Sequence, residues 1–172
     1  DASARGPRDD ARARMARTAE RVRTALAQGL PAGLPETVMA RAATPVDDRL
    51  TPGSFTASAG SRDYLLYLPA ATQPTALVVM LHGCTQTAAD FAAGTAMNAQ
   101  ADRHGFAVLY PAQSRSANQS ACWNWFQPGH QAAGRGEPAI LADMAREAAE
   151  RHAIPSNRLF VAGLSAGGAM AA

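Results

Sequence analysis

Lysine is absent from this chain of 172 residues, so all sixteen of its basic residues are arginines. With fourteen acidic residues they leave a net charge of +2, which is too small to indicate a nucleic acid or an anionic membrane as partner. Long apolar runs are also missing, since no stretch approaches the roughly 18 residues of a membrane-spanning helix. A hydrophobic content of 47% with 17% charged residues is instead typical of a globular chain with a core.

Cysteine is scarce, because Cys84 and Cys122 are the only two. They allow one disulfide, which would favour an oxidising compartment, or two unrelated buried thiols. A metal site formed with His82 and His130 is a third interpretation. The His-x-Cys spacing is not a usual zinc pattern, however, and long gaps separate the pairs. We therefore expect no metal and no other cofactor.

Residues 1–53 predict an N-terminal helix followed by a proline-rich arm. Apolar residues recur at helical spacing over 11–28, and Gly29 and Pro31 then end the pattern. The stripe consists of Met15, Ala19, Val22 and Leu26. Because it is only weakly apolar, we favour a helix docked on a domain surface over a membrane-surface or targeting helix. The chain starts at Asp1 without an initiator Met or a signal peptide, so we expect a removed leader or a start within the gene.

The segment from 54 to 172 predicts a second domain, which opens with a β-hairpin. Short apolar runs begin at Phe55 and at Tyr64, and residues 59–61 between them are typical of a turn. The two strands are therefore expected to pair with each other.

Buried strands and helices alternate in the rest of this domain. The runs 77–81 and 106–110 have no polar alternation, which is typical of strands buried on both faces of a parallel sheet. A helix is predicted between them over 87–104, and another from 137 to 152, where Pro stands at the first helical position. A third buried strand is predicted over 158–163. This alternation predicts an α/β fold with a mainly parallel sheet and flanking helices.

The third strand runs directly into Gly163-Leu164-Ser165-Ala166-Gly167. A strand, a Gly-x-Ser-x-Gly turn and a helix-compatible run are together typical of a nucleophile elbow, which projects the serine clear of the sheet. The glycines lack the Cβ atoms that would clash in so tight a turn. A glycine-rich turn that binds phosphate or merely packs is the alternative. The flanking strand and helix favour Ser165 as a catalytic nucleophile.

A second motif, His82-Gly83-Cys84-Thr85-Gln86, directly follows the first buried strand. Acyl transfer develops negative charge on the carbonyl oxygen, and two fixed backbone N–H groups can stabilise it. We expect these donors to be the N–H of Ala166, after the nucleophile, and the N–H of Cys84. We do not assign the catalytic base to His82, because in hydrolases with this elbow the histidine follows the serine in the chain.

These motifs resemble a known family. The segments 81–86, 122–126 and 162–170 are similar to the polyhydroxybutyrate depolymerase family of esterases, which is related to feruloyl and acetylxylan esterases. The resemblance implies an α/β-hydrolase fold and ester hydrolysis by a Ser-Asp-His triad in an often secreted protein. It also implies a Cys84–Cys122 disulfide that holds an aromatic loop beside the oxyanion hole.

The same resemblance places the later strands, the catalytic Asp and the catalytic His beyond Ala172. We therefore expect an incomplete α/β-hydrolase that is aggregation-prone alone or needs the missing C-terminal segment as a second chain. Asp143 is not a credible substitute for the catalytic acid.

The expected activity is that of a serine carboxylic-ester hydrolase acting on a hydroxyalkanoate polyester, its oligomers or a related short-chain ester. A feruloyl or acetylxylan type of esterase and a catalytically inactive fragment are the alternatives. Three aromatic side chains in the loop of about 25 residues after Pro111 are expected to form an apolar wall for substrate, or else to pack beneath the loop. They are Trp123, Trp125 and Phe126. The expected location is extracellular or periplasmic.

Overall fold

The computed structural model describes residues 47–70 and 73–172, which lie within one compact unit, Thr44–Ala172. The helix expected over 11–28 and most of the proline-rich arm lie outside the described residues. Within the described part, none of the helices has the length and apolar character needed to cross a membrane.

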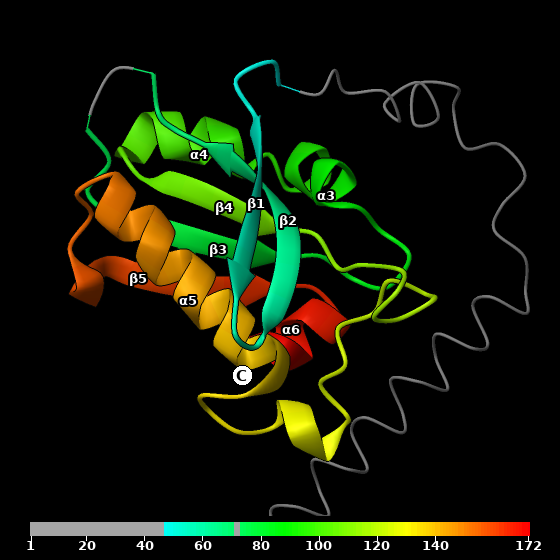
Figure 1. Ribbon diagram of the computed structural model, residues 1–172. Helices are drawn as coiled ribbons and strands as arrows, with labels where there is room; N and C mark the ends of the chain where they lie inside the picture. The colour runs from blue at the N-terminus through cyan, green and yellow to red at the C-terminus, as the bar shows by residue number, and fades with distance from the viewer. Residues whose placement is uncertain (1–46, 71–72) are drawn as a thin grey trace, which may run out of the picture. The chain divides into compact units, whose positions relative to one another are not determined.

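A single five-stranded sheet organises the described residues (Figure 1). Its strands are β1 (Thr51–Ala57), β2 (Gly60–Tyr67), β3 (Leu77–Leu81), β4 (Ala107–Pro111) and β5 (Leu159–Gly163), in the spatial order β1-β2-β4-β3-β5. The predicted hairpin is confirmed, since β1 and β2 pair antiparallel, and β2 also pairs antiparallel with β4. The strands β4, β3 and β5 form the predicted parallel part. The sheet is therefore mixed.

Helices cover both faces of this sheet (Figure 1). The α-helices are α3 (Ala88–Thr95), α4 (Met97–His104), α5 (Gly136–Arg151) and α6 (Ala166–Ala171), with short 3₁₀ helices η2 (Pro128–His130) and η3 (Ser156–Arg158). Alternate residues of β3 serve the two faces: Leu77 and Val79 pack with α5, whereas Met80 packs with α3 and α4. This explains why the sequence of β3 has no polar alternation.

The long helix expected between β3 and β4 is two helices, so that prediction was wrong. Ala96 adopts a left-handed backbone (φ 51°, ψ 26°), which ends α3 and redirects α4. The redirected helix makes tertiary hydrogen bonds. Asn98 accepts one from the Tyr110 hydroxyl at 2.7 Å, and Asp102 accepts one from the Tyr67 hydroxyl at 2.8 Å. These bonds to β4 and β2 outweigh the local preference for a continuous helix.

The strand β5 was expected to be buried but is mostly exposed. Phe160 and Val161 are 50% and 49% exposed, and Leu164 just beyond the strand is 53% exposed. The strand order gives the reason, because β5 pairs with β3 alone among the described strands. An apolar hollow of about 280 Å³ lies beside it, with Leu141 of α5 and Met170 of α6 in its lining. This edge of the sheet therefore offers an apolar surface.

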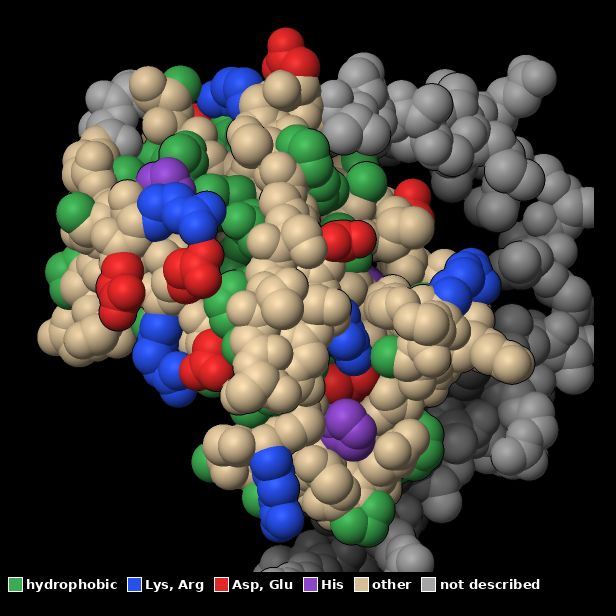
Figure 2. Space-filling view, viewed as in Figure 1, with side chains coloured by type: hydrophobic (Ala, Val, Ile, Leu, Met, Phe, Trp, Pro, Cys, Tyr) green, Lys and Arg blue, Asp and Glu red, His purple; other side chains and the backbone are tan. Residues whose placement is uncertain are grey.

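Acidic and basic side chains are interspersed on the face of the molecule shown in Figure 2. Among the described residues, Arg151 pairs with Glu147 along α5, and Arg49 pairs with Asp102 at 3.0 Å. Exposed pairs of this kind contribute little to stability. No large patch of one sign gathers on that face.

Candidate active site

Ser165 lies in a tight turn between β5 and α6. Its backbone has φ 54° and ψ −119°, a conformation that residues with a Cβ rarely adopt. The residue is exposed, while Ala166, which opens α6, is buried. The turn thus presents the serine side chain to solvent at the end of the parallel strands, as expected for an elbow.

Two glycines allow this turn to form. A Cβ added to Gly163 would lie 2.4 Å from the carbonyl oxygen of Gly167, and a Cβ on Gly167 would lie 2.1 Å from the carbonyl oxygen of Leu81. Both distances are far below van der Waals contact and involve backbone atoms. The start of α6 therefore rests directly on the end of β3, an approach that only glycine permits.

The loop after β3 lies against the elbow. A Cβ added to Gly83 would be 3.6 Å from the Ser165 Cβ. The Gly83 N–H donates to Gln86 Oε1 at 2.8 Å, but the Cys84 N–H and the Ala166 N–H donate to no other described residue. The two amides expected to form an oxyanion hole are thus uncommitted, and each belongs to one of the two segments that meet at Ser165.

His82 is buried and both of its ring nitrogens are engaged. Nε2 accepts the backbone N–H of Gln113 at 3.1 Å, so the ring proton lies on Nδ1, which donates to the Gly83 carbonyl at 2.8 Å. Burial lowers the pKa of His82, although the Gly83 carbonyl opposes this in part. A neutral ring with two partners has a structural role and is not available as a base.

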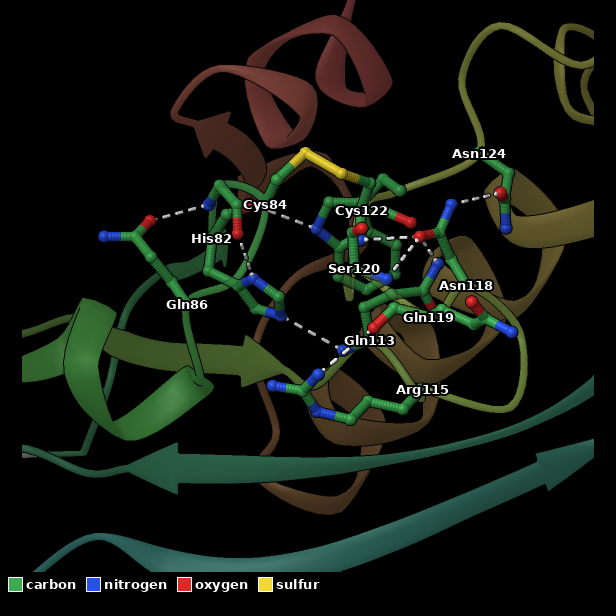
Figure 3. The surroundings of a disulfide bond; sticks show 12 residues. His82, Cys84, Gln86, Gln113, Arg115, Asn118, Gln119, Ser120, Cys122 and Asn124 are labelled. Carbon is green, nitrogen blue, oxygen red and sulfur yellow. Dashed lines mark hydrogen bonds between the residues drawn. A yellow bond between two sulfur atoms is a disulfide. The ribbon is translucent and has the colours of Figure 1, made fainter.

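The disulfide between Cys84 and Cys122 is present, so the expected pairing is confirmed (Figure 3). It joins the loop after β3 to the loop after β4 across a sequence separation of 38 residues. The Thr85 N–H adds a hydrogen bond to the Ser120 carbonyl at 2.8 Å. On the chain-entropy model a ring of this size contributes about 3–4 kcal/mol. The bridge fixes the backbone of the residue expected to supply one oxyanion donor.

The three aromatic residues do not form one wall. Trp123 is fully buried in the core, and its indole N–H donates to the His82 carbonyl at 3.1 Å. Its large apolar ring therefore packs beneath the loop, which was the alternative to a place in the wall. Trp125 and Phe126 are exposed and pack edge to face with ring centroids 6.0 Å apart. Trp125 also lines a hollow of about 490 Å³ together with Met170 of α6.

Glu137 is a residue of the site region that sequence reasoning missed. Acid in the first turn of a helix predicts a favourable interaction with the helix dipole. In the structure this carboxylate is buried and accepts hydrogen bonds from Arg62, Gln113 and Asn124. The partners come from β2 and from the long loop, far away in sequence, so no local pattern could have indicated them.

The described residues contain no group of three or more His, Cys, Asp or Glu side chains that could hold a metal ion. Cys84 and Cys122, which belong to the metal site considered from the sequence, are bonded to each other in the disulfide. His130 accepts the Glu137 backbone N–H at its Nδ1, at 2.8 Å. None of the described histidines hydrogen-bonds to the Ser165 hydroxyl.

The strand order, the crossover helices and the serine between β5 and α6 define an α/β-hydrolase fold, and solved structures agree. The acetyl xylan esterase from Aspergillus awamori superimposes with a TM-score of 0.61 at 22% identity, over 70% of this chain and 44% of that chain. The chain belongs to the family described as Esterase PHB depolymerase, whose model matches residues 62–172.

Curated relatives are named for two kinds of ester. Poly(3-hydroxyalkanoate) depolymerase C of Paucimonas lemoignei is 38% identical over 118 residues, which are 68% of this chain and 28% of that protein. Feruloyl esterase B of Neurospora crassa is 34% identical over 101 residues, which are 58% of this chain and 33% of that protein. The chain thus spans about a third or less of the length of these relatives.

Proposed function

We propose that this protein is a serine carboxylic-ester hydrolase with Ser165 as its nucleophile. The observation that carries the proposal is the positive-φ backbone of Ser165 at the junction of β5 and α6, directly against the loop of Cys84. This geometry exposes a hydroxyl beside two uncommitted amides. Membership of the esterase family supports the same reaction.

The reaction follows from this arrangement. A base removes the Ser165 proton, and Oγ attacks the ester carbonyl carbon. The carbonyl oxygen becomes an oxyanion, which accepts hydrogen bonds from the Cys84 and Ala166 N–H groups. The intermediate collapses, the alcohol leaves with the proton from the base, and water then cleaves the acyl-enzyme by the same steps.

We assign the base and its orienting acid to a segment beyond Ala172, or to a second chain that carries it. Two observations support this assignment. The described histidines make no bond to Ser165, and His82 already has partners at both nitrogens. The exposed apolar side of β5 and the hollow beside it offer such a segment a surface to pack against.

Two classes of substrate are candidates, a hydroxyalkanoate polyester and a feruloyl or acetyl ester. The more similar depolymerase relative favours a hydroxyalkanoate polyester, while the feruloyl esterase relative favours a phenolic ester on a sugar. Exposed Trp125 and Phe126 offer an apolar contact to either. Assaying the protein on polyester film and on a feruloylated oligosaccharide discriminates the two, and we expect the higher kcat/KM on the polyester oligomers.

A p-nitrophenyl ester assay tests the proposed function. We expect hydrolysis when the chain is continued by, or mixed with, its C-terminal segment, and a loss of at least about 10³-fold for Ser165→Ala. The chain of residues 1–172 alone is expected to give no turnover and to aggregate in sedimentation experiments. Hydrolysis by that chain alone, abolished by Ser165→Ala, would show that a base has been missed. Hydrolysis unaffected by Ser165→Ala would refute the nucleophile.

An extracellular or periplasmic location is part of the proposal. It is supported by the disulfide, because such bonds persist in oxidising compartments. Expression with and without export to the periplasm tests it. Protein from the periplasm should have no titratable thiol, and protein from the reducing cytoplasm should have two and a lower thermal midpoint.

A further inference from the structure

The carboxylate of Glu137 is the centre of a buried polar cluster behind the candidate active site. Glu137 is 1% exposed and accepts four hydrogen bonds. Oε1 receives Arg62 Nη2 at 3.0 Å, Gln113 Nε2 at 2.5 Å and Asn124 Nδ2 at 2.8 Å, and Oε2 receives the Asn124 backbone N–H at 2.7 Å. A buried side chain that accepts this many hydrogen bonds holds its neighbours rigidly.

Gln113 connects this cluster to the active-site loop. Its side-chain amide donates both to Glu137 and to the Cys122 carbonyl, the latter at 2.9 Å. Its backbone N–H donates to His82 Nε2 at 3.1 Å. The Gln113 side-chain oxygen also accepts Arg62 Nε at 2.8 Å, so each hydrogen-bonding atom of this side chain has a partner within the cluster.

Two routes therefore lead from Glu137 to the loop that faces Ser165. Figure 3 shows their later part, at Gln113, His82, Cys122 and Cys84. One runs through Gln113 to His82, whose Nδ1 fixes the Gly83 carbonyl. The other runs through Cys122 and the disulfide to Cys84. The first route ends on the Gly83 carbonyl, which shares its peptide group with the Cys84 N–H, and the second ends on the Cys84 side chain.

We propose that Glu137 is a positioning residue for the oxyanion hole, holding the Cys84 N–H in place through Gln113, His82 and Cys122. The inference rests on the proposed function. Glu137 contacts neither substrate nor Ser165. Its effect is on the orientation of the Cys84 N–H. Misplacement of a catalytic group by about 1 Å can cost about 100-fold in rate, so a buried anchor of this kind controls turnover.

The variant Glu137→Gln tests the inference in the hydrolytically active protein of full natural length. Its new NH2 group cannot accept a hydrogen bond, so one of the four donors loses its partner while the side-chain shape is kept. We expect kcat for a p-nitrophenyl ester to fall about 10- to 100-fold, with KM changed less than about threefold, because the oxyanion forms only after binding. Hydrogen exchange of the 83–86 and 120–124 amides should speed up.

Two variants on the same helix are the controls. Met144→Ala removes a buried core side chain without touching the cluster, so it lowers the thermal midpoint and leaves kcat at 25 °C within about twofold. Glu147→Gln removes an exposed carboxylate paired with Arg151 and should change neither quantity. A fall in kcat for Glu137→Gln alone therefore separates positioning from stability.

If Glu137→Gln does not fold, Gln113→Ala cuts the same route while Glu137 keeps its other donors, and the same loss of kcat is expected. Unchanged kcat in whichever of these variants folds overturns the inference and leaves the proposed function intact. A fall in kcat for Met144→Ala equal to that for Glu137→Gln also overturns it. Hydrolysis that survives Ser165→Ala overturns the proposed function, and the inference with it.

Discussion

The loop that carries Cys84 and the turn that carries Ser165 lie against each other, yet they are held by different interactions. The loop is tied by the disulfide to Cys122, by both ring nitrogens of His82 and by the Trp123 indole. The turn has no side-chain hydrogen bond or covalent link among the described residues. It is held by backbone hydrogen bonds and by the close approach of glycines.

This difference determines what each region tolerates. Several independent interactions hold the loop, so removal of one of them is expected to take away only part of the free energy of unfolding that the loop contributes. The turn requires glycine at positions 163 and 167, because a Cβ atom at either position would clash with backbone atoms that surround it. Four predictions test this contrast, from the largest expected effect to the smallest.

Gly167→Ala should have the largest effect. Its Cβ would lie 2.1 Å from the Leu81 carbonyl oxygen, so α6 must move off β3, and we expect a loss of more than about 3 kcal/mol in the free energy of unfolding. Gly168→Ala is the matched control. Its Cβ would lie 3.1 Å from the Gly163 oxygen, and the change should stay within about 1 kcal/mol. Urea unfolding of the protein of full natural length, followed by circular dichroism, measures both, and equal midpoints would contradict the prediction.

Removal of the disulfide should come next. The double variant Cys84→Ser with Cys122→Ser is expected to lose about 3–4 kcal/mol of unfolding free energy, because the ring no longer restricts the unfolded chain. The same urea experiment on the parent chain in dithiothreitol should give a matching midpoint. A loss below about 1 kcal/mol would show that the loop is held by its hydrogen bonds alone.

Trp123→Phe should have an intermediate effect. The change leaves the buried His82 carbonyl without its indole donor, which is expected to cost about 1–3 kcal/mol. Trp125→Phe, in the same loop but exposed, should stay within about 0.5 kcal/mol. Thermal unfolding of the two variants side by side checks the contrast. A larger loss for Trp125→Phe would mean that the exposed ring, rather than the buried one, supports the loop.

The smallest effect expected is a pH dependence that comes from His82. Burial lowers its pKa, so at pH above about 6.5 the ring is neutral in both the folded and the unfolded chain. Below that value His82 is protonated in the unfolded chain while the buried ring of the folded chain stays neutral. The free energy of unfolding therefore falls as the pH drops toward the lower pKa of the folded chain. Urea midpoints between about pH 7.5 and pH 5 should fall more steeply for the parent chain than for His82→Gln.

His152 and the acidic groups are common to both chains, so the difference between the two pH profiles isolates His82. Burial also lowers the pKa of His152, which is why the parent profile alone would not suffice. Parallel profiles would show that His82 does not contribute to the loop through its neutral form.

Local sequence patterns were sufficient for much of the fold. The unbroken apolar runs of β3 and β4 indicated strands buried on both faces, and Pro138 marked the start of α5 to within two residues. The Gly-x-Ser-x-Gly turn indicated the elbow, because glycines are required where backbones come so close. In each case the signal itself is local, even where the interaction that requires it joins distant residues, as between Gly167 and Leu81.

Features that depend on spatial order could not be predicted in this way. The apolar sequence of β5 is that of a central strand, and its exposure follows only from its place at the edge of the described sheet. The break at Ala96 depends on hydrogen bonds from α4 to other elements. The polar cluster around Glu137 joins residues 13 to 75 positions away, which leaves no local pattern. Such features arise from packing, not from propensity.

The Cys84–Cys122 bond has a practical consequence for this molecule under proteolysis. It closes a covalent ring that contains α3, α4, β4 and the largely exposed segment 114–120. A single protease cut inside that ring leaves one molecule of unchanged mass apart from an added water. Only a reducing agent then separates the piece that bears Ser165 from the piece that bears Cys84, so paired gels run with and without reductant locate the nick.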